Sequence, residues 1–174
     1  MSKKRSSGIL AHITSLPSPY GIGDIGSSSY DFIDFLVESD QSCWQFLPTG
    51  PTNSTFDDSP YMSISAFAGS PLLISPQLLV DDGLVTKQEL KAHPSFSPYE
   101  TDFKTVRRYK TETLHRAYQN FDPDSIRNYQ LFLENSKHWL EDYALFMTFK
   151  EKYAFKGWNK WPLVRGKSGK SELD

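Results

Sequence analysis

The chain has a single cysteine, Cys43, among its 174 residues. One thiol cannot form an internal disulfide, and its place in a short apolar run predicts a small buried side chain. A membrane-spanning helix needs about 20 consecutive apolar residues, and no stretch of this sequence approaches that length. The basic start, Lys3 to Arg5, is not followed by the apolar segment of a secretory signal. We therefore expect a cytoplasmic protein without a membrane partner.

The chain also lacks a strong charge of either sign and a cluster of metal ligands. Its 19 basic and 21 acidic residues give a net charge of −2, which does not predict binding to nucleic acid. The four histidines follow no metal-ligand spacing, so we expect no metal site. They are His12, His93, His115 and His138. His12 is either a satisfied core histidine or the edge of a pocket.

Alternating segments predict a mixed α/β start to the chain. Residues 8–14 and 42–47 are short apolar runs typical of buried strands, and between them a helix has an apolar face around Phe32 to Val37. A serine among Ser27 to Ser29 is expected to cap that helix. Strand, helix and strand with short connections predict two parallel strands and a right-handed crossover.

The rest of the chain predicts helices rather than a continued sheet. Residues 71–74 are a last apolar run, interpreted as a strand, and Pro76 opens a short helix that Gly83 ends. A capping box is expected at residues 86–89. Further helices are predicted at residues 102–118, at 124–134 and from 139 to about 155. The tail, residues 158–174, is expected to carry no packed element.

Three glycines between the first strand and the first helix match the outline of a dinucleotide fingerprint. Gly21, Gly23 and Gly26 have the spacing G-x-G-x-x-G, with Asp40 downstream. In that fold the glycines follow the strand at once, whereas here Pro17 and its neighbours intervene. A turn that needs glycine is the favoured interpretation, and nucleotide binding is a distant alternative.

The loop from Pro51 to Tyr61 concentrates aromatic, hydroxyl and carboxylate side chains. Aromatic faces accept sugar rings and short polar side chains satisfy sugar hydroxyls, so this mixture suits a carbohydrate. The alternative is a packed loop whose aromatic residues fill the core. Asp57 and Asp58 are neighbours whose side chains diverge. They are therefore poor candidates for the two opposed carboxyls of glycoside chemistry, which lie about 5–5.5 Å apart for retention or about 6.5–9.5 Å apart for inversion.

Seven blocks of this sequence resemble one known family, in order and in spacing. The blocks are Arg5–His12, Thr14–Pro17, Pro19–Asp24, Trp44–Pro48, Gly50–Thr52, Asp58–Tyr61 and Ser65–Gly69. They resemble the N-terminal part of the 4-α-glucanotransferases, also called amylomaltases or disproportionating enzymes, of glycoside hydrolase family 77. The resemblance implies the first strands of a TIM (β/α)₈ barrel in residues 1–75 and a mainly helical insertion in residues 76–174. The barrel is expected to be incomplete in this chain.

The resemblance also implies a function and a set of site residues. Family members transfer α-1,4-glucan segments to an acceptor sugar by a retaining mechanism, without a cofactor. By position, Tyr61 is expected to contact sugar, Asp58 and Ser59 to shape its loop, and Phe56 to touch glucan. Met62 stands where relatives usually have glutamine. The catalytic carboxylates fall outside this chain, which leaves no catalytic residue in it.

The expected protein is thus a truncated N-terminal part that is inactive alone. Its expected partners are a maltooligosaccharide or α-1,4-glucan and the remaining C-terminal part of the barrel. A second hypothesis is a non-catalytic maltodextrin-binding or interaction module.

Overall fold

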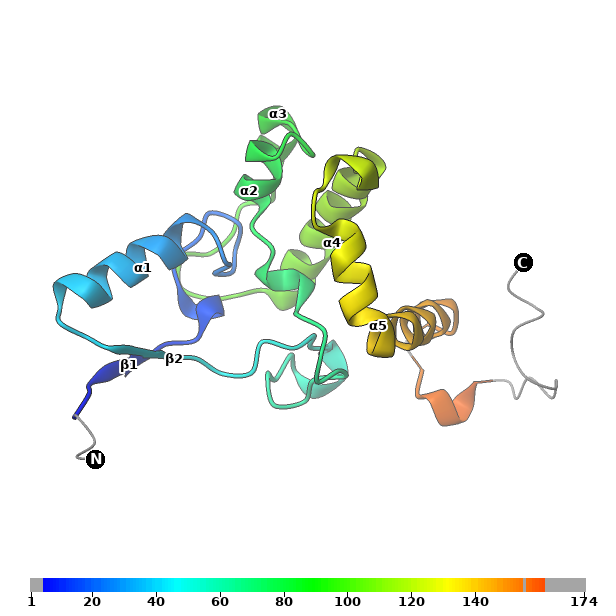
Figure 1. The fold of residues 1–174 in the computed structure, drawn as a ribbon, viewed down its shortest axis with the longest axis horizontal. Helices are drawn as coiled ribbons and strands as arrows, with labels where there is room; N and C mark the ends of the chain where they lie inside the picture. The colour runs from blue at the N-terminus through cyan, green and yellow to red at the C-terminus, as the bar shows by residue number, and fades with distance from the viewer. Residues whose placement is uncertain (1–4, 155, 162–174) are drawn as a thin grey trace. The chain divides into compact units, whose positions relative to one another are not determined.

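The computed structural model describes residues 5–154 and 156–161 (Figure 1). The chain divides into two compact units, Met1–Arg127 and Asn128–Asp174, which are treated separately below. Lys3, Lys4 and most of the predicted unpacked tail, residues 162–174, lie outside the described residues. Among the helices that are described, none combines the length and apolar character needed to cross a membrane.

The first unit begins with the predicted strand–helix–strand arrangement. Strand β1 (Gly8–Leu10) and strand β2 (Cys43–Gln45) pair in parallel, with Ile9 opposite Trp44, and helix α1 (Ser27–Glu38) connects them (Figure 1). The indole Nε1 of Trp44 donates to the carbonyl oxygen of Ala11 at 2.8 Å, which extends the pairing beyond the ladder. The parallel pairing is confirmed, although both strands are shorter than predicted.

The predicted burial of β2 is wrong. Cys43 is exposed, and Phe46, just beyond the strand, is 46% exposed. The described part of the chain contains two strands, so β2 has a paired neighbour on one side only. An apolar run predicts burial only if other elements cover both faces of the strand, and here that cover is incomplete.

The expected serine cap of α1 is also wrong. Gly26 occupies the position before the helix and makes no side-chain cap. The serines instead hold the preceding turn: Ser28 Oγ donates to the carbonyl of Pro17 at 2.6 Å, and Ser29 Oγ donates to the carbonyl of Asp24 at 2.7 Å. Their hydroxyls therefore serve as tertiary donors rather than as acceptors for helical N–H groups.

Residues 71–74 are buried in part, as predicted, but they do not form a strand. Pro71–Leu73 is a turn of 3₁₀ helix, η3, with Pro71 at its start and the Ser70 hydroxyl accepting from the Leu72 N–H at 3.3 Å. That cap and the fixed φ of proline favour a helical turn over an extended run. Leu72 packs with Ile22 and Val106 in one cluster of the core.

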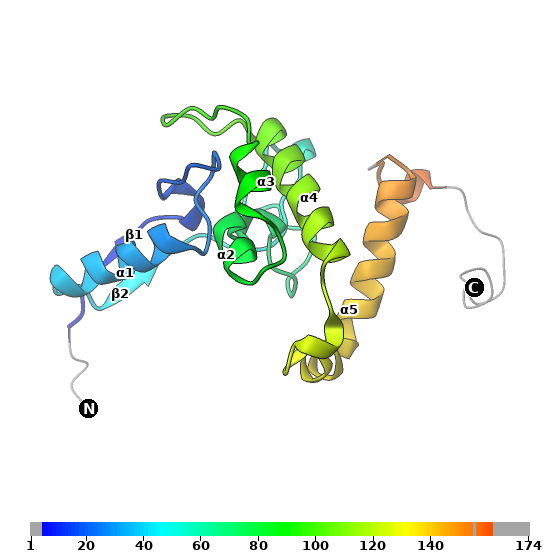
Figure 2. The same ribbon diagram turned by 90° about the horizontal axis from the view of Figure 1, so that it is seen from above.

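Three helices follow η3 in the first unit. They are α2 (Pro76–Asp81), α3 (Lys87–Lys91) and α4 (Phe103–Gln119), which lie together in Figure 2. Thr86 and Glu89 form the predicted capping box, and Gly83 has the left-handed φ of 73° that ends α2. Val85, Leu90 and Ala117 form a second core cluster between these helices.

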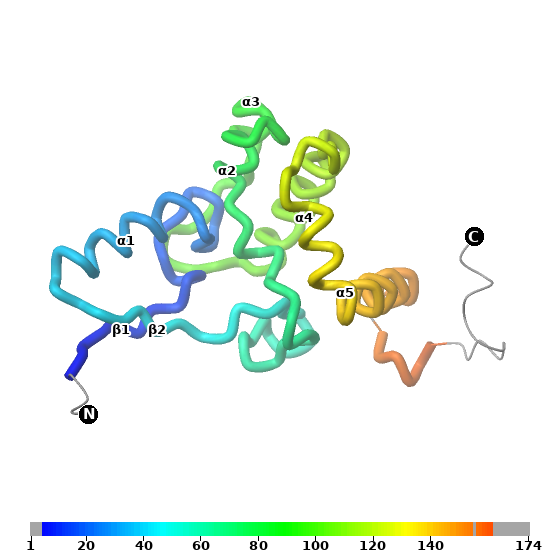
Figure 3. Tube along the Cα trace, in the orientation of Figure 1, coloured from blue at the N-terminus to red at the C-terminus, as the bar shows by residue number. Residues whose placement is uncertain are grey.

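The predicted helix at residues 124–134 is wrong in its start. Pro123–Ser125 makes one 3₁₀ turn, η4, capped by the Asp122 carboxylate, and Ile126 is extended. The second unit then consists of one long helix, α5 (Tyr129–Lys152), and a short turn, η5 (Trp158–Lys160), traced in Figure 3. As predicted for the second half of the chain, no strand follows residue 74 in the residues that the structure describes.

Candidate functional site

The loop between β2 and η3 is ordered by local hydrogen bonds. Asn53 Oδ1 accepts from the N–H of Thr55 at 3.0 Å and starts the turn η2 (Ser54–Phe56). Asp57 and Asp58 follow with φ of 50° and 54°, in the left-handed region that aspartate tolerates better than most residues. The segment that follows this pair carries Tyr61, whose side chain is exposed.

Asp58 anchors this loop from inside. Its side chain is buried, its Oδ1 accepts from the Thr52 hydroxyl at 2.9 Å, and the same oxygen is ion-paired with Arg107 of α4. A buried carboxylate is tolerated only with such partners. Of the four predicted binding residues, Asp58 is therefore bonded inside the protein, where it also lines a hollow of about 210 Å³.

Tyr61 lies at the edge of a hollow of about 520 Å³. The walls of this hollow, called the Tyr61 hollow below, are Pro48, Thr49, Gly50, Pro60, Tyr61, Ser63, Ser65, Ala66, Phe67, Ala68 and Gly69. Tyr61 is 70% and Phe67 65% exposed, so the loop presents two aromatic side chains to solvent. The predicted alternative, a loop whose aromatic residues fill the core, does not describe these two side chains.

Ser59 and Phe56 do not line the Tyr61 hollow. Ser59 holds the turn, because its N–H donates to the Phe56 carbonyl at 2.9 Å and its carbonyl accepts from Met62 N–H at 3.1 Å. Phe56 is 47% exposed on η2. The structure thus separates the four predicted residues into three groups. Tyr61 lines the Tyr61 hollow, Asp58 and Ser59 hold the backbone of the loop, and Phe56 lies outside the lining.

A smaller hollow of about 210 Å³ shares the wall formed by Pro48, Thr49, Gly50 and Pro60. His12 lines it, and the Nδ1 atom of His12 accepts from the Leu47 N–H at 3.2 Å. Burial lowers the pKa of this imidazole, which favours its neutral form. Of the two interpretations of His12, the edge of a pocket is the one that the structure supports.

The glycine-rich turn packs against protein rather than around an open cradle. A Cβ on Gly23 would lie 2.0 Å from the carbonyl oxygen of Ile13, and one on Gly26 would lie 2.4 Å from Ser75 Oγ. Gly21 has a φ of 79°, which a side chain would strain. The glycines are therefore required by close packing and by a turn, which is the interpretation favoured from the sequence.

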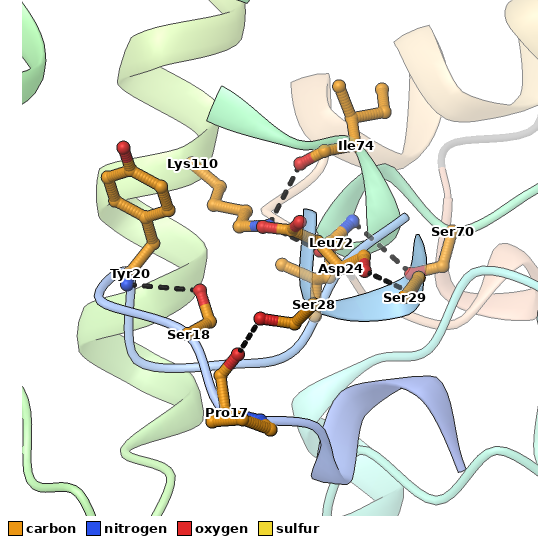
Figure 4. Close-up of polar contacts among 10 residues, drawn as sticks. All are labelled: Pro17, Ser18, Tyr20, Asp24, Ser28, Ser29, Ser70, Leu72, Ile74 and Lys110. Carbon is orange, nitrogen blue, oxygen red and sulfur yellow. Dashed lines mark hydrogen bonds and ion pairs between the residues drawn. The ribbon is translucent and has the colours of Figure 1, made fainter. Parts of the chain in front are cut away.

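Lys110 of α4 holds the same turn from the core (Figure 4). Its Nζ donates to the Asp24 carboxylate at 3.2 Å and to the carbonyls of Leu72 and Ile74 at 2.7 and 2.9 Å. Burial lowers the pKa of Lys110 and raises the pKa of Asp24, and in each case the charge of the partner opposes the shift. The sequence analysis did not predict a role for Lys110 or Arg107. The one pattern that could have indicated it is that these two cations lie three residues apart on a predicted helix, and therefore on the same face.

Within the residues that are placed, no three His, Cys, Asp or Glu side chains gather into a set able to hold a metal ion. The residues that line the Tyr61 hollow offer aromatic faces, hydroxyls and backbone amides. These groups bind neutral, hydroxyl-rich molecules.

Comparison with known proteins decides the family. A model of glycoside hydrolase family 77, described as 4-alpha-glucanotransferase, matches residues 11–172. The chain belongs to the 4-α-glucanotransferase family. This confirms the resemblance found in the seven sequence blocks.

Relatives of this 4-α-glucanotransferase family member share about two residues in five with it. The enzyme from Aquifex aeolicus is 44% identical over 160 residues, which cover 90% of this chain and 31% of that protein. The enzyme from Thermus thermophilus is 40% identical, with coverage of 94% and 32%. An amylomaltase from Streptococcus agalactiae, solved in complex with acarbose, superposes with a TM-score of 0.84 at 40% identity and covers 91% of this chain.

The chain spans about a third of the length of the relatives that it matches. Its mixed arrangement of helices and few strands is the arrangement of the corresponding third of the solved amylomaltase.

Proposed function

We propose that this chain provides part of the glucan-binding groove of a 4-α-glucanotransferase. The reaction of the whole enzyme, in this proposal, is retaining transfer of α-1,4-glucan segments to an acceptor sugar. The 174 residues bind maltooligosaccharide at the Tyr61 hollow and do not transfer it by themselves. The observation that carries the proposal is that the exposed Tyr61 and Phe67 both line a hollow with hydroxyl side chains and backbone, within a chain of this family.

The roles of the four binding residues are assigned as follows. Tyr61 stacks on a sugar ring, and Asp58 and Ser59 hold the backbone that presents it. Phe56, half-exposed on η2, provides a second aromatic contact for a longer glucan. Acarbose in the solved amylomaltase supports a sugar as the ligand of this site.

The carboxylates of the loop support a binding role rather than a catalytic one. Asp58 is buried and paired with Arg107, and Asp57 is its direct neighbour along the chain. Retaining chemistry needs two opposed carboxyls about 5–5.5 Å apart. We therefore assign no catalytic residue to this chain.

The proposal extends to architecture and location. The parallel pair β1 and β2 with its connecting helix α1 forms the first strands of a (β/α)₈ barrel, in residues 1–75, and the helices of residues 76–174 form an insertion. The remaining barrel is the expected protein partner, and the cytoplasm is the expected location.

Titration calorimetry with maltoheptaose tests the binding role. The unmodified chain should bind, and Tyr61→Ala should weaken binding about tenfold, or about 1.4 kcal/mol, because the stacking face is lost. Tyr118→Ala, at a 76% exposed position on α4, is the matched control and should bind normally. Absence of binding by the unmodified chain would refute the proposal.

Incubation with maltotriose tests the absence of catalysis by the chain alone. No glucose should appear above the background of the buffer. Glucose release by the pure chain would overturn the assignment of no catalytic residue, and binding without turnover would also fit a maltodextrin-binding module. Adding the remaining part of a relative's barrel separates the two, because only a groove fragment should restore transfer.

A further inference from the structure

The backbone of the Tyr61 loop needs an external restraint. Asp57 and Asp58 are consecutive residues with positive φ, a conformation that costs free energy at each position unless the surroundings enforce it. The hydrogen bonds of Asn53, Ser59 and Met62 close short turns within the loop. Turns of this kind shape the loop locally but do not fix it to the core.

Arg107 supplies such a restraint from a distant part of the sequence. Its guanidinium bonds to Asp58 Oδ1, and its Nη2 also donates to the Thr52 hydroxyl at 3.3 Å, while Thr52 in turn donates to Asp58. The Asp58 side chain is 5% exposed and that of Arg107 is 35% exposed. Hydrogen bonds between ionised groups are about twice as strong as those between neutral groups, so this triangle is a firm attachment.

The helix that carries Arg107 is itself fixed. One turn further along α4, Lys110 is buried and binds Asp24 and the carbonyls of Leu72 and Ile74 (Figure 4). Residues three apart lie on the same face of a helix. The face of α4 that meets the core therefore holds the start of the unit through Lys110 and the loop through Arg107.

The attachment point is three residues from Tyr61. Ser59 N–H donates to the Phe56 carbonyl and Met62 N–H donates to the Ser59 carbonyl, so the segment from Phe56 to Met62, which contains Asp58 and Tyr61, is a pair of consecutive closed turns. Pro60 in its middle has a fixed φ. Because this segment is short and internally closed, the position of Asp58 determines the position of Tyr61.

We propose that Arg107 is a positioning residue for glucan binding, which holds Asp58 and thereby keeps Tyr61 at the hollow. This inference rests on the proposed function of the Tyr61 hollow and adds to it a residue on α4. Arg107 touches no sugar in this assignment. Its effect on glucan affinity passes through the loop.

Hydrogen exchange and glucan binding together test this role. In Arg107→Met, which keeps the length of the side chain but removes its charge, amide exchange in residues 51–69 should rise about tenfold and maltoheptaose affinity should fall about tenfold. Asp58→Asn should give the same pair of changes. Arg107→Lys keeps the charge without the planar fork and should recover part of both. Arg108→Met, at an exposed neighbouring position on α4, should change neither.

The outcomes separate this inference from the proposed function. Unchanged exchange of the loop in Arg107→Met overturns the holding role, and faster exchange with unchanged affinity overturns the role in binding. Exchange in α4 and α2 reports whether a variant has unfolded, and Asp58→Asn then provides the second measurement. If the unmodified chain binds no glucan, the proposed function fails and the binding role of Arg107 fails with it. Exchange still decides whether Arg107 holds the loop.

Discussion

At the scale of single residues, Lys110 is unusual because its charged side chain is buried. It is 2% exposed, and its ammonium group has three oxygen partners from two different segments. Removing water from a charge costs several kcal/mol, and these partners offset that cost. The same principle applies to Asp24, whose buried carboxylate is stabilised by the Lys110 ammonium group.

The Lys110–Asp24 pair gives a prediction about stability. Lys110→Met leaves a buried carboxylate without its partner and should lower the free energy of unfolding by about 3–5 kcal/mol. Adding Asp24→Asn to that variant should restore part of the loss, because the remaining group is then neutral. Urea unfolding of the two single variants and the double variant measures the coupling between the sites. Losses that simply add would show that the pair does not act as a unit.

At the scale of elements, the features that were predicted correctly are those determined by residues close together in the sequence. The capping box at Thr86, the start of α2 at Pro76 and the parallel pairing across α1 are set by neighbours along the chain, and all were found. The burial of Cys43 depends on what covers β2, which is not encoded near Cys43. The charged partners of Asp58 and Asp24 lie 49 and 86 residues away, so no local pattern could reveal them.

The same distinction applies to the candidate site. The motif that contains Asp58 and Tyr61 located the loop by resemblance, and the structure then separated inward from outward side chains. Adjacent residues of one motif thus take opposite roles. Their roles depend on the left-handed turn at Asp57 and Asp58, which the sequence does not specify.

The glycine-rich turn between β1 and α1 gives a prediction at this scale. Gly23→Ala should lower the free energy of unfolding by about 1–3 kcal/mol, because the new Cβ would meet the rigid Ile13 carbonyl. Gly69→Ala is the control: nothing lies within 4 Å of its built Cβ, and its effect should stay within about 0.5 kcal/mol. Thermal unfolding compares the two. Equal midpoints would contradict the close packing of this turn.

At the scale of the molecule, the first unit leaves several large apolar side chains in contact with water. Leu10 is 60% exposed, Phe35 48%, Val37 68% and Phe46 46%. They belong to β1, to α1 and to the residue after β2, the elements assigned above to the start of a barrel. Apolar side chains at the border of a short sheet favour association with other chains.

This exposure predicts that the chain binds a dye for apolar surfaces. Anilinonaphthalene sulfonate should fluoresce with the native chain. A variant with Leu10→Lys and Val37→Lys should lose about half of that signal, while its melting temperature changes little because both positions are exposed. If the dye does not fluoresce with the native chain, the exposure of apolar side chains on β1, α1 and Phe46 is contradicted. Light scattering should show less self-association in the double variant.

The contacts of α4 also determine when the first unit can finish folding during synthesis. Lys110 follows Asp24 by 86 residues. Because a ribosome adds about 5–20 residues per second, Lys110 is synthesised roughly 4–17 s after Asp24. Until α4 emerges, neither the N-terminal turn nor the Tyr61 loop has its distant attachment. Folding of the first unit is therefore expected to complete only after α4 has been made, and the nascent chain before that point is the species that chaperones would meet.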